Sequence, residues 1–260
     1  MQVAVITGAA SGIGAGLARV AAERGFQVVL ADRDEAGLAQ VARDIGEQAL
    51  AVVVDVTSED SMNALAEKAY ARFGQVDLLF NNAGVLTTGR SWEISAAQWD
   101  RAWGVNVNGV LNGLRAFVPR LLAAGRPARI VNTASVGGFL PSPLMAPYSA
   151  TKFAVVALTE SLAGELAAME PRIAVSLLAP GPVKSRIFRE APPDAASGFH
   201  GQMTDLLAQH GMDGETFARH VFEAIDRGEY WIVPQPEALY PLLERRQAMI
   251  AAREMPTAVW

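Results

Sequence analysis

Three residues whose side chains can handle a proton lie close together in the middle of the chain. Tyr148 and Lys152 are four positions apart, and Ser135 comes thirteen positions before Tyr148. Positions i and i+4 of a helix share one face, so this phenol and this ammonium can meet. A nearby cation stabilises a phenolate and lowers the pKa of a tyrosine toward neutral pH. The spacing therefore predicts a tyrosine that exchanges a proton with an alcohol or ketone, while Ser135 holds the reacting oxygen.

A tyrosine and a lysine at this spacing also occur by chance on surface helices, so the start of the chain carries much of the argument. An apolar run over 3–6 predicts a buried parallel strand, and Gly8, Gly12 and Gly14 follow it at once, at the start of a helical pattern. This arrangement aims backbone N–H groups and a helix N-terminus at a pyrophosphate. Gly8 permits the tight turn, Gly12 lets the ligand approach, and Gly14 lets the helix pack on the strand. The pattern predicts a dinucleotide site rather than an ordinary glycine-rich turn.

The second predicted strand ends at an acidic residue. Asp32 follows the run 28–31, about twenty residues beyond the glycines, where a carboxylate can accept hydrogen bonds from both ribose hydroxyls of adenosine. It would repel a 2′-phosphate, so it favours NAD over NADP. Arg33 follows directly and could instead bind a 2′-phosphate, which leaves NADP as the alternative. Asp34 has the position of a helix cap.

Together these motifs resemble the short-chain dehydrogenase/reductase family over nearly the whole chain. The family's patterns appear as Thr7-Gly8-x-x-x-Gly12-x-Gly14, Asp55-Val56, Asn81-Asn82-Ala83-Gly84, Asn106, Ser135 with Tyr148 and Lys152, and Pro180-Gly181. The cofactor-binding residues that we expect are Gly8, Ser11, Gly12, Ile13, Gly14, Asp32, Arg33, Asp55, Val56, Asn82, Ala83, Gly84, Tyr148, Lys152, Pro180, Gly181, Val183 and Ser185. The family more often has Thr at the position of Ser185, and the hydroxyl is retained.

The resemblance implies a catalytic set of Asn106, Ser135, Tyr148 and Lys152. In it, Lys152 lowers the pKa of Tyr148 and holds the nicotinamide ribose, while Asn106 positions a water that links Lys152 to solvent. Each of these residues taken alone also fits a structural role, as a strand-end hydroxyl, a capping amide, a packed ring or a solvated amine.

The expected substrate site is apolar and suits a hydrophobic or aromatic secondary alcohol or ketone. Its expected residues are Ser135, Phe139, Leu144, Met145, Tyr148, Ile187 and Phe188, with Leu140, Val85, Leu86, Trp92 and Trp103 as further candidates. The segments 107–113, 117–120 and 233–237 are similar to bacterial dehydrogenases that oxidise benzylic secondary alcohols of lignin-derived aryl ethers. This narrower resemblance implies an aryl substrate.

Strand-like runs alternate with helical patterns along the chain, which predicts one doubly wound α/β domain over 1–260. We expect a mostly seven-stranded parallel sheet of Rossmann type with helices on both faces. Helices are predicted over 35–46, 59–73, 96–123, 148–168 and 214–226, and the strands over 3–6, 28–31, 50–54, 77–80, 129–132, 173–178 and 230–233. Because strand ends share one edge of such a sheet, Gly12, Asp32, Asn82, Ser135 and Pro180 should converge there.

Two late segments are interpreted separately. The region 186–213 is rich in proline, glycine and alanine, and we interpret it as a mobile flap over the substrate; an ordinary long connection is the alternative. The tail over 237–253 has a helical pattern. Small residues on the two long central helices, Gly109, Gly113, Ala154, Ala157 and Gly164, favour a homodimer or homotetramer, although packing within one chain explains them as well.

Composition excludes several kinds of function. The net charge is −5 without a basic cluster, which argues against a nucleic-acid partner. The sequence has no cysteine, and its three histidines are ten positions apart, so no metal-ligand pattern is present. No signal segment or bilayer-length apolar stretch is seen, and we therefore expect a cytoplasmic protein without a membrane partner.

The sequence thus predicts an NAD-dependent alcohol dehydrogenase acting on a hydrophobic or aromatic secondary alcohol or ketone. An NADPH-dependent carbonyl reductase is the first alternative. A binding protein that senses NAD without catalysis is the second, and it has little need of Ser135, Tyr148 and Lys152.

Overall fold

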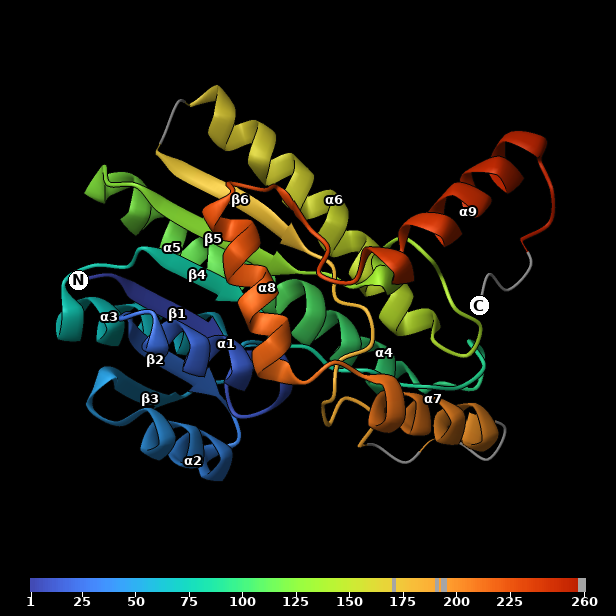
Figure 1. Cartoon of the computed structure of the whole chain (residues 1–260), viewed down its shortest axis with the longest axis horizontal. Coiled ribbons are helices and arrows are strands. Elements are labelled where there is room, and N and C mark those ends of the chain that lie inside the picture. The colour runs from blue at the N-terminus through green and yellow to red at the C-terminus, as the bar shows by residue number, and fades with distance from the viewer. Residues whose placement is uncertain (170–171, 190–191, 193–195, 257–260) are drawn as a thin grey trace.

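The computed structural model of the chain describes residues 1–169, 172–189, 192 and 196–256. The strands in these residues are β1 (Val3–Thr7), β2 (Gln27–Asp32), β3 (Ala49–Val53), β4 (Leu78–Asn81), β5 (Ala128–Thr133), β6 (Ile173–Leu178) and β7 (Trp231–Ile232). They pair in parallel in the order β3-β2-β1-β4-β5-β6-β7 (Figure 1). Within the described residues, the predicted seven-stranded doubly wound sheet is therefore confirmed.

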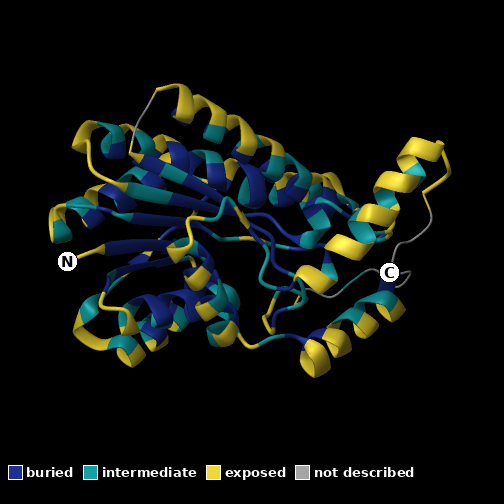
Figure 2. Cartoon of the chain, turned by 45° about the horizontal axis from the view of Figure 1, so that its top comes forward, coloured by how far each residue is buried: buried dark blue, intermediate teal, exposed yellow. Residues whose placement is uncertain are grey.

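Helices cover both faces of this sheet. They are α1 (Gly12–Glu23), α2 (Glu35–Ile45), α3 (Glu59–Phe73), α4 (Ala96–Trp103), α5 (Gly109–Ala124), α6 (Ala146–Ala168), α7 (Ser197–His210), α8 (Gly214–Asp226) and α9 (Tyr240–Ala252). Alternate strand residues supply two cores: Val3 and Val5 pack toward α3, α5 and α6, whereas Ala4 and Ile6 pack toward α1, α2 and α8. Figure 2 shows the strands as a buried layer between the helices.

Several helices begin at the carboxyl edge of the sheet with a capping side chain. Asp34 accepts a hydrogen bond from Gly37 N at 3.0 Å, which confirms it as the cap of α2. Ser58 caps α3, and Asp213 caps α8 by accepting from Glu215 N and Thr216 N. Caps satisfy backbone donors that a helix leaves unpaired at its first turn, so they fix where each helix starts.

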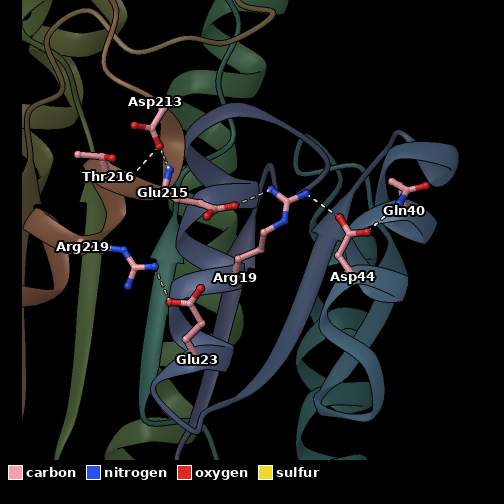
Figure 3. Close-up of polar contacts among 8 residues, drawn as sticks. All are labelled: Arg19, Glu23, Gln40, Asp44, Asp213, Glu215, Thr216 and Arg219. Atoms are coloured by element: carbon pink, nitrogen blue, oxygen red, sulfur yellow. Dashed lines mark hydrogen bonds and ion pairs between the residues drawn. The ribbon is translucent and has the colours of Figure 1, made fainter.

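Helix α1 is held between its two neighbouring helices. Arg19 forms ion pairs with Asp44 of α2, at 2.8 Å, and with Glu215 of α8, at 3.7 Å, while Glu23 pairs with Arg219 of α8 at 2.8 Å (Figure 3). The crossing of α1 and α8 is close, because a Cβ added to Gly16 would lie 2.1 Å from the Gly214 carbonyl oxygen. Exposed ion pairs of this kind contribute little individually, so the close backbone approach dominates the position of α1.

The structure differs from the sequence-based elements in two places. The helix predicted over 96–123 is divided into α4 and α5 by a π-helical turn, Gly104–Asn108. Such turns insert one residue and often mark functional sites. Helix α7 was not predicted, because the glycine and alanine content of this region suggested a loop. Helix α9, drawn in red, extends away from the sheet (Figure 1) and has no buried residue.

Within the described part of the chain, no helix combines the length and the apolar character needed to cross a bilayer.

Candidate active site

One cavity of about 1040 Å³ opens at the carboxyl edge of the sheet. It is lined by Gly12, Asp32, Asn82, Ser135 and Pro180, which confirms that these residues converge. The remaining expected cofactor-binding residues also line it, namely Gly8, Ser11, Ile13, Gly14, Arg33, Asp55, Val56, Ala83, Gly84, Tyr148, Lys152, Gly181, Val183 and Ser185. The volume is at the upper end of ordinary ligand sites, which suits a dinucleotide together with a substrate.

The glycine turn leaves room and donors for a ligand. Gly8 and Gly12 have φ values of 71° and 55°, a region that residues with a Cβ rarely adopt. A Cβ on Gly14 would lie 2.1 Å from the Gly8 carbonyl oxygen, so only glycine lets α1 start this close to β1. The Ser11 side chain makes no capping hydrogen bond, which leaves the first-turn N–H groups of α1 for an anion. These observations fit a pyrophosphate.

The Asp32 carboxylate, which lines the cavity near the glycine turn, is held by hydrogen bonds from two backbone N–H groups. One carboxylate oxygen accepts from Ala10 N at 3.1 Å and the other from Asp34 N at 3.0 Å. Asp32 thereby joins the glycine turn to the start of α2 and faces the cavity beside the exposed Arg33. Arg186, from the segment after β6, lies 3.9 Å from Asp34 across the cavity mouth. The carboxylates of Asp32 and Asp34 and the two arginines therefore line the expected adenosine end.

Tyr148, Lys152 and Ser135 meet in the middle of the cavity. Tyr148 and Lys152 come from the first turns of α6 and are 8% and 3% exposed, and Ser135 follows β5 and is 7% exposed. The Lys152 Nζ lies 5.7 Å from the centre of the Tyr148 ring and donates to the Thr133 carbonyl oxygen at 2.8 Å. The predicted proximity of phenol, ammonium and hydroxyl is thus present in the fold.

The pKa values correct one part of the prediction. Burial raises the pKa of Tyr148 above its ordinary value, and a hydrogen bond with Ser135 lowers it in part. Burial also lowers the pKa of Lys152 to about 8. In the chain alone, the loss of hydration is the largest influence on the Tyr148 phenol, so its pKa does not fall as the sequence analysis predicted.

Asn106 lies beside the cavity and its side chain is used for structure. Its Nδ2 donates to the Val85 carbonyl oxygen at 3.0 Å and to Thr151 Oγ1 at 2.9 Å, and its Oδ1 accepts from Val85 N at 2.8 Å. The side chain thus joins the segment after β4 to α6. A Cβ built on Gly84 would be 3.5 Å from both Asn106 Oδ1 and Lys152 Nζ, so Asn106 remains close to the ammonium.

The other end of the cavity is apolar. Leu86, Met145 and Tyr148 form a buried cluster with Ile187, Phe188 and Phe199, which agrees with the expected positions of Met145, Ile187 and Phe188. Helix α7 adds residues that the sequence analysis missed, namely Phe199, Gln202, Met203, Leu206 and Leu207, and the C-terminal segment adds Ala238 and Leu242. The spacing 199, 202, 203 and 206 is that of one helix face, so this signal was available in the sequence.

Four expected substrate residues lie elsewhere. The ring of Phe139 packs against Trp231, with centroids 5.9 Å apart, and does not line the cavity. Leu144 is also absent from the lining; its backbone has a φ of 62°, and its carbonyl oxygen accepts from Gly89 N at 2.9 Å. Trp92 and Trp103 are 80% and 40% exposed and lie outside the lining as well. Phe139 and Leu144 follow Ser135 closely, but nearness in sequence does not fix the direction of a side chain, and the two tryptophans face solvent instead of the cavity.

Comparison with known proteins identifies the family. Residues 2–196 match the family model described as short chain dehydrogenase. The chain belongs to the short-chain dehydrogenase family. This short-chain dehydrogenase is 36% identical to the C alpha-dehydrogenase of Sphingobium sp., over 96% of the chain and 85% of that protein. It is 31% identical to the CLA biosynthesis dehydrogenase/reductase of Lactiplantibacillus plantarum, over 98% of the chain and 95% of that protein.

A solved structure gives the same result. A short chain dehydrogenase/reductase from Burkholderia phymatum, in complex with NAD, superimposes with a TM-score of 0.94 at 37% identity, covering 98% of the chain and 96% of that one. The predicted family is confirmed, as is the likeness to a benzylic-alcohol dehydrogenase. The chain is therefore an oxidoreductase of this family, and the Burkholderia phymatum member that superimposes on it was solved with NAD.

Proposed function

We propose that this short-chain dehydrogenase transfers hydride between NAD and a hydrophobic, aromatic secondary alcohol or the corresponding ketone. The observation that carries the proposal is the position of Tyr148. Its ring belongs to the apolar cluster at one end of the cavity, while Lys152 and the glycine turn lie on the side that fits a dinucleotide. A proton-transferring group is therefore located between the two parts of a single cavity.

The residues of the chain have separate tasks in this proposal. Ser135 donates a hydrogen bond to the substrate oxygen, which orients it and stabilises charge that develops there. Tyr148 takes the hydroxyl proton during oxidation and returns it to the forming alkoxide during reduction. Lys152, with its Nζ 5.7 Å from the Tyr148 ring centre, partly offsets the cost that burial adds to forming the phenolate, and Asn106 holds the segment after β4 against α6. The bound nicotinamide supplies the hydride acceptor or donor.

Cofactor preference is assigned to Asp32. Its carboxylate accepts hydrogen bonds from ribose hydroxyls and repels a 2′-phosphate, which favours NAD. NADPH-dependent reduction is the alternative, and it is supported by the two arginines at the same end: Arg33 and Arg186 both line the cavity and are exposed. A phosphate would pair with either guanidinium.

The substrate class follows from the apolar end. Its lining is aliphatic, aromatic and thioether in character, which suits an aryl group better than a sugar or a phosphate. The likeness to the C alpha-dehydrogenase of Sphingobium sp. supports a benzylic secondary alcohol. Helix α7 serves as the flap in this proposal, because one of its faces forms part of the wall and is joined to Thr88 by a contact of 3.4 Å from His200.

We further propose that the active form is a homo-oligomer built on α4, α5 and α6. Ala157 and Gly164 are exposed on α6 and leave its surface flat. Two of the small residues considered for this role serve the chain itself: Gly109 packs against Val56, and a Cβ on Gly113 would be 2.1 Å from Asn81 Oδ1.

The proposal is tested by assaying aryl and alkyl secondary alcohols, with NADH absorbance as the readout. We expect turnover with benzylic alcohols, and we expect Tyr148→Phe to reduce kcat by at least about 1000-fold with little change in NADH affinity. Tyr70→Phe is the matched control, since the Tyr70 hydroxyl is also buried but lies outside the cavity. Undiminished turnover by the Tyr148 variant would refute the proposed mechanism.

A further inference from the structure

The segment after β7 crosses the turn that follows β6. Gln235, 6% exposed, lies at this crossing. Its side-chain Oε1 accepts from Gly181 N at 3.1 Å, and its Nε2 donates to the Pro182 carbonyl oxygen at 2.8 Å. A single buried amide therefore binds both sides of the turn.

The Gln235 side chain makes these hydrogen bonds because the backbone pairing of β6 and β7 does not reach the turn. The ladder between β6 and β7 ends where Leu178 pairs with Ile232, and Ala179 N donates to the Ile232 carbonyl oxygen at 2.9 Å. Beyond this point, prolines occupy 180 and 182 on one side and 234 and 236 on the other, and none of them has an N–H to donate. The amide of Gln235 carries one acceptor and one donor group, so it replaces the missing peptide partner.

The contact also explains why residue 181 is a glycine. A Cβ added there would lie 3.0 Å from Gln235 Oε1 and 3.2 Å from the Cβ of Ala238. These distances are shorter than ordinary van der Waals contacts, so a side chain at 181 would push the amide away. Gly181 and Gln235 thus depend on each other.

The same turn is bound on two further sides. The Pro182 carbonyl oxygen also accepts from Met212 N at 3.0 Å, next to α8. The Pro180 carbonyl oxygen accepts from Val136 N at 2.9 Å and from Ser135 Oγ at 3.5 Å. Three segments distant in sequence therefore fix 180–182, and one of them carries the hydroxyl proposed to hold the substrate.

We infer that Gln235 is a positioning residue that holds the 180–182 turn in the shape that receives the nicotinamide end of the cofactor. The inference rests on the proposed function, since the turn lines the cavity beside Ser135. Gln235 also connects this turn to the segment after β7, whose residues Ala238 and Leu242 line the cavity. Without the amide, Gly181 N and the Pro182 carbonyl oxygen lose a buried partner, and cofactor binding has to order the turn.

Two variants separate the parts of this contact. Gln235→Met keeps the length of the side chain and removes both hydrogen bonds. Gln235→Glu keeps an acceptor for Gly181 N and removes the donor to Pro182. Gln48→Met is the matched control, because Gln48 Nε2 likewise donates to two backbone oxygens, of Ala22 and Phe26, but lies outside the cavity lining.

The readouts are the dissociation constant of NADH, followed by fluorescence, and the hydrogen exchange of the Gly181 amide in the full chain before cofactor is added. We expect Gln235→Met to weaken NADH binding about tenfold and to speed Gly181 exchange at least about tenfold. We expect Gln235→Glu to retain the Gly181 protection with an intermediate loss of NADH affinity, and Gln48→Met to change neither.

Unchanged NADH affinity and unchanged exchange in Gln235→Met would overturn the inference. If that variant does not fold, Gln235→Glu decides in its place, since wild-type NADH affinity in it would contradict the role of the Pro182 contact. Failure of the unsubstituted chain to bind NADH or NADPH would instead refute the proposed function. Fast exchange of the Gly181 amide in that chain would refute the hydrogen bond between Gly181 N and Gln235.

Discussion

Lys152 is a buried cation, and its replacement by methionine is expected to stabilise the cofactor-free chain near neutral pH. The side chain is 3% exposed, and burial lowers its pKa from 10.5 to about 8. The folded chain therefore holds this proton more weakly than the unfolded chain does. The penalty is complete below about pH 8, decreases as the pH rises above that value, and is absent above the unfolded pKa.

The magnitude follows from the size of this shift. One pKa unit corresponds to about 1.4 kcal/mol, so the buried charge costs the wild-type chain about 3 kcal/mol at about pH 7 and about 1 kcal/mol at about pH 9.5. Methionine removes this cost but leaves the Thr133 carbonyl oxygen without the donor that now lies 2.8 Å away. That loss is worth about 1–2 kcal/mol at every pH. Lys152→Met should thus be more stable by about 1–2 kcal/mol at neutral pH.

The assay is urea unfolding of both chains at about pH 7 and about pH 9.5. The advantage of Lys152→Met should shrink by about 2 kcal/mol between these conditions. Lys68→Met, which replaces an exposed lysine of α3, is the control and should show no such trend. A stability difference that does not change with pH would refute the reasoning, because it would mean that folding leaves the proton affinity of Lys152 as it was.

Two further variants test other parts of the structure. Asp32→Asn removes the charge that opposes a 2′-phosphate, and it should raise NADPH affinity relative to NADH about tenfold in a fluorescence titration; an unchanged ratio would contradict the assignment of cofactor preference to Asp32. Gly16→Ala should destabilise the chain by about 3 kcal/mol in urea unfolding, because its Cβ would meet the Gly214 carbonyl oxygen at 2.1 Å. Gly198→Ala, on α7 with open space around it, is the control and should be neutral or slightly stabilising, so equal effects of the two substitutions would refute the close α1–α8 crossing.

Local patterns made much of the fold predictable. The strands have apolar runs, and the caps Asp34 and Ser58 are short polar residues directly before helical periods. The glycine turn and the i, i+4 pair Tyr148 and Lys152 depend on geometry within a few residues, so their positions could be predicted without the rest of the chain. The convergence of strand ends followed from the rule that parallel strands share an edge.

The parts that were missed depend on contacts between distant segments. The π-helical turn at Asn106 accompanies bonds to Val85 and Thr151, which are far from it in sequence. The Phe139 ring packs against Trp231 on β7, which is far from it in sequence. No local spacing reports such contacts, and the apolar face of α7 was overlooked because its composition suggested a loop.

The sequence by itself determined which groups are available: a glycine turn for phosphates, a carboxylate at the end of β2, and a phenol one helical turn from an ammonium. Only the tertiary structure decided how far these groups are buried and which residues form hydrogen bonds with them. Burial reverses the expected direction of the Tyr148 pKa, and a glutamine from beyond β7 fixes the turn after β6. The physical reason is that residue types and short spacings are local, whereas desolvation and long-range hydrogen bonds exist only once distant segments pack together.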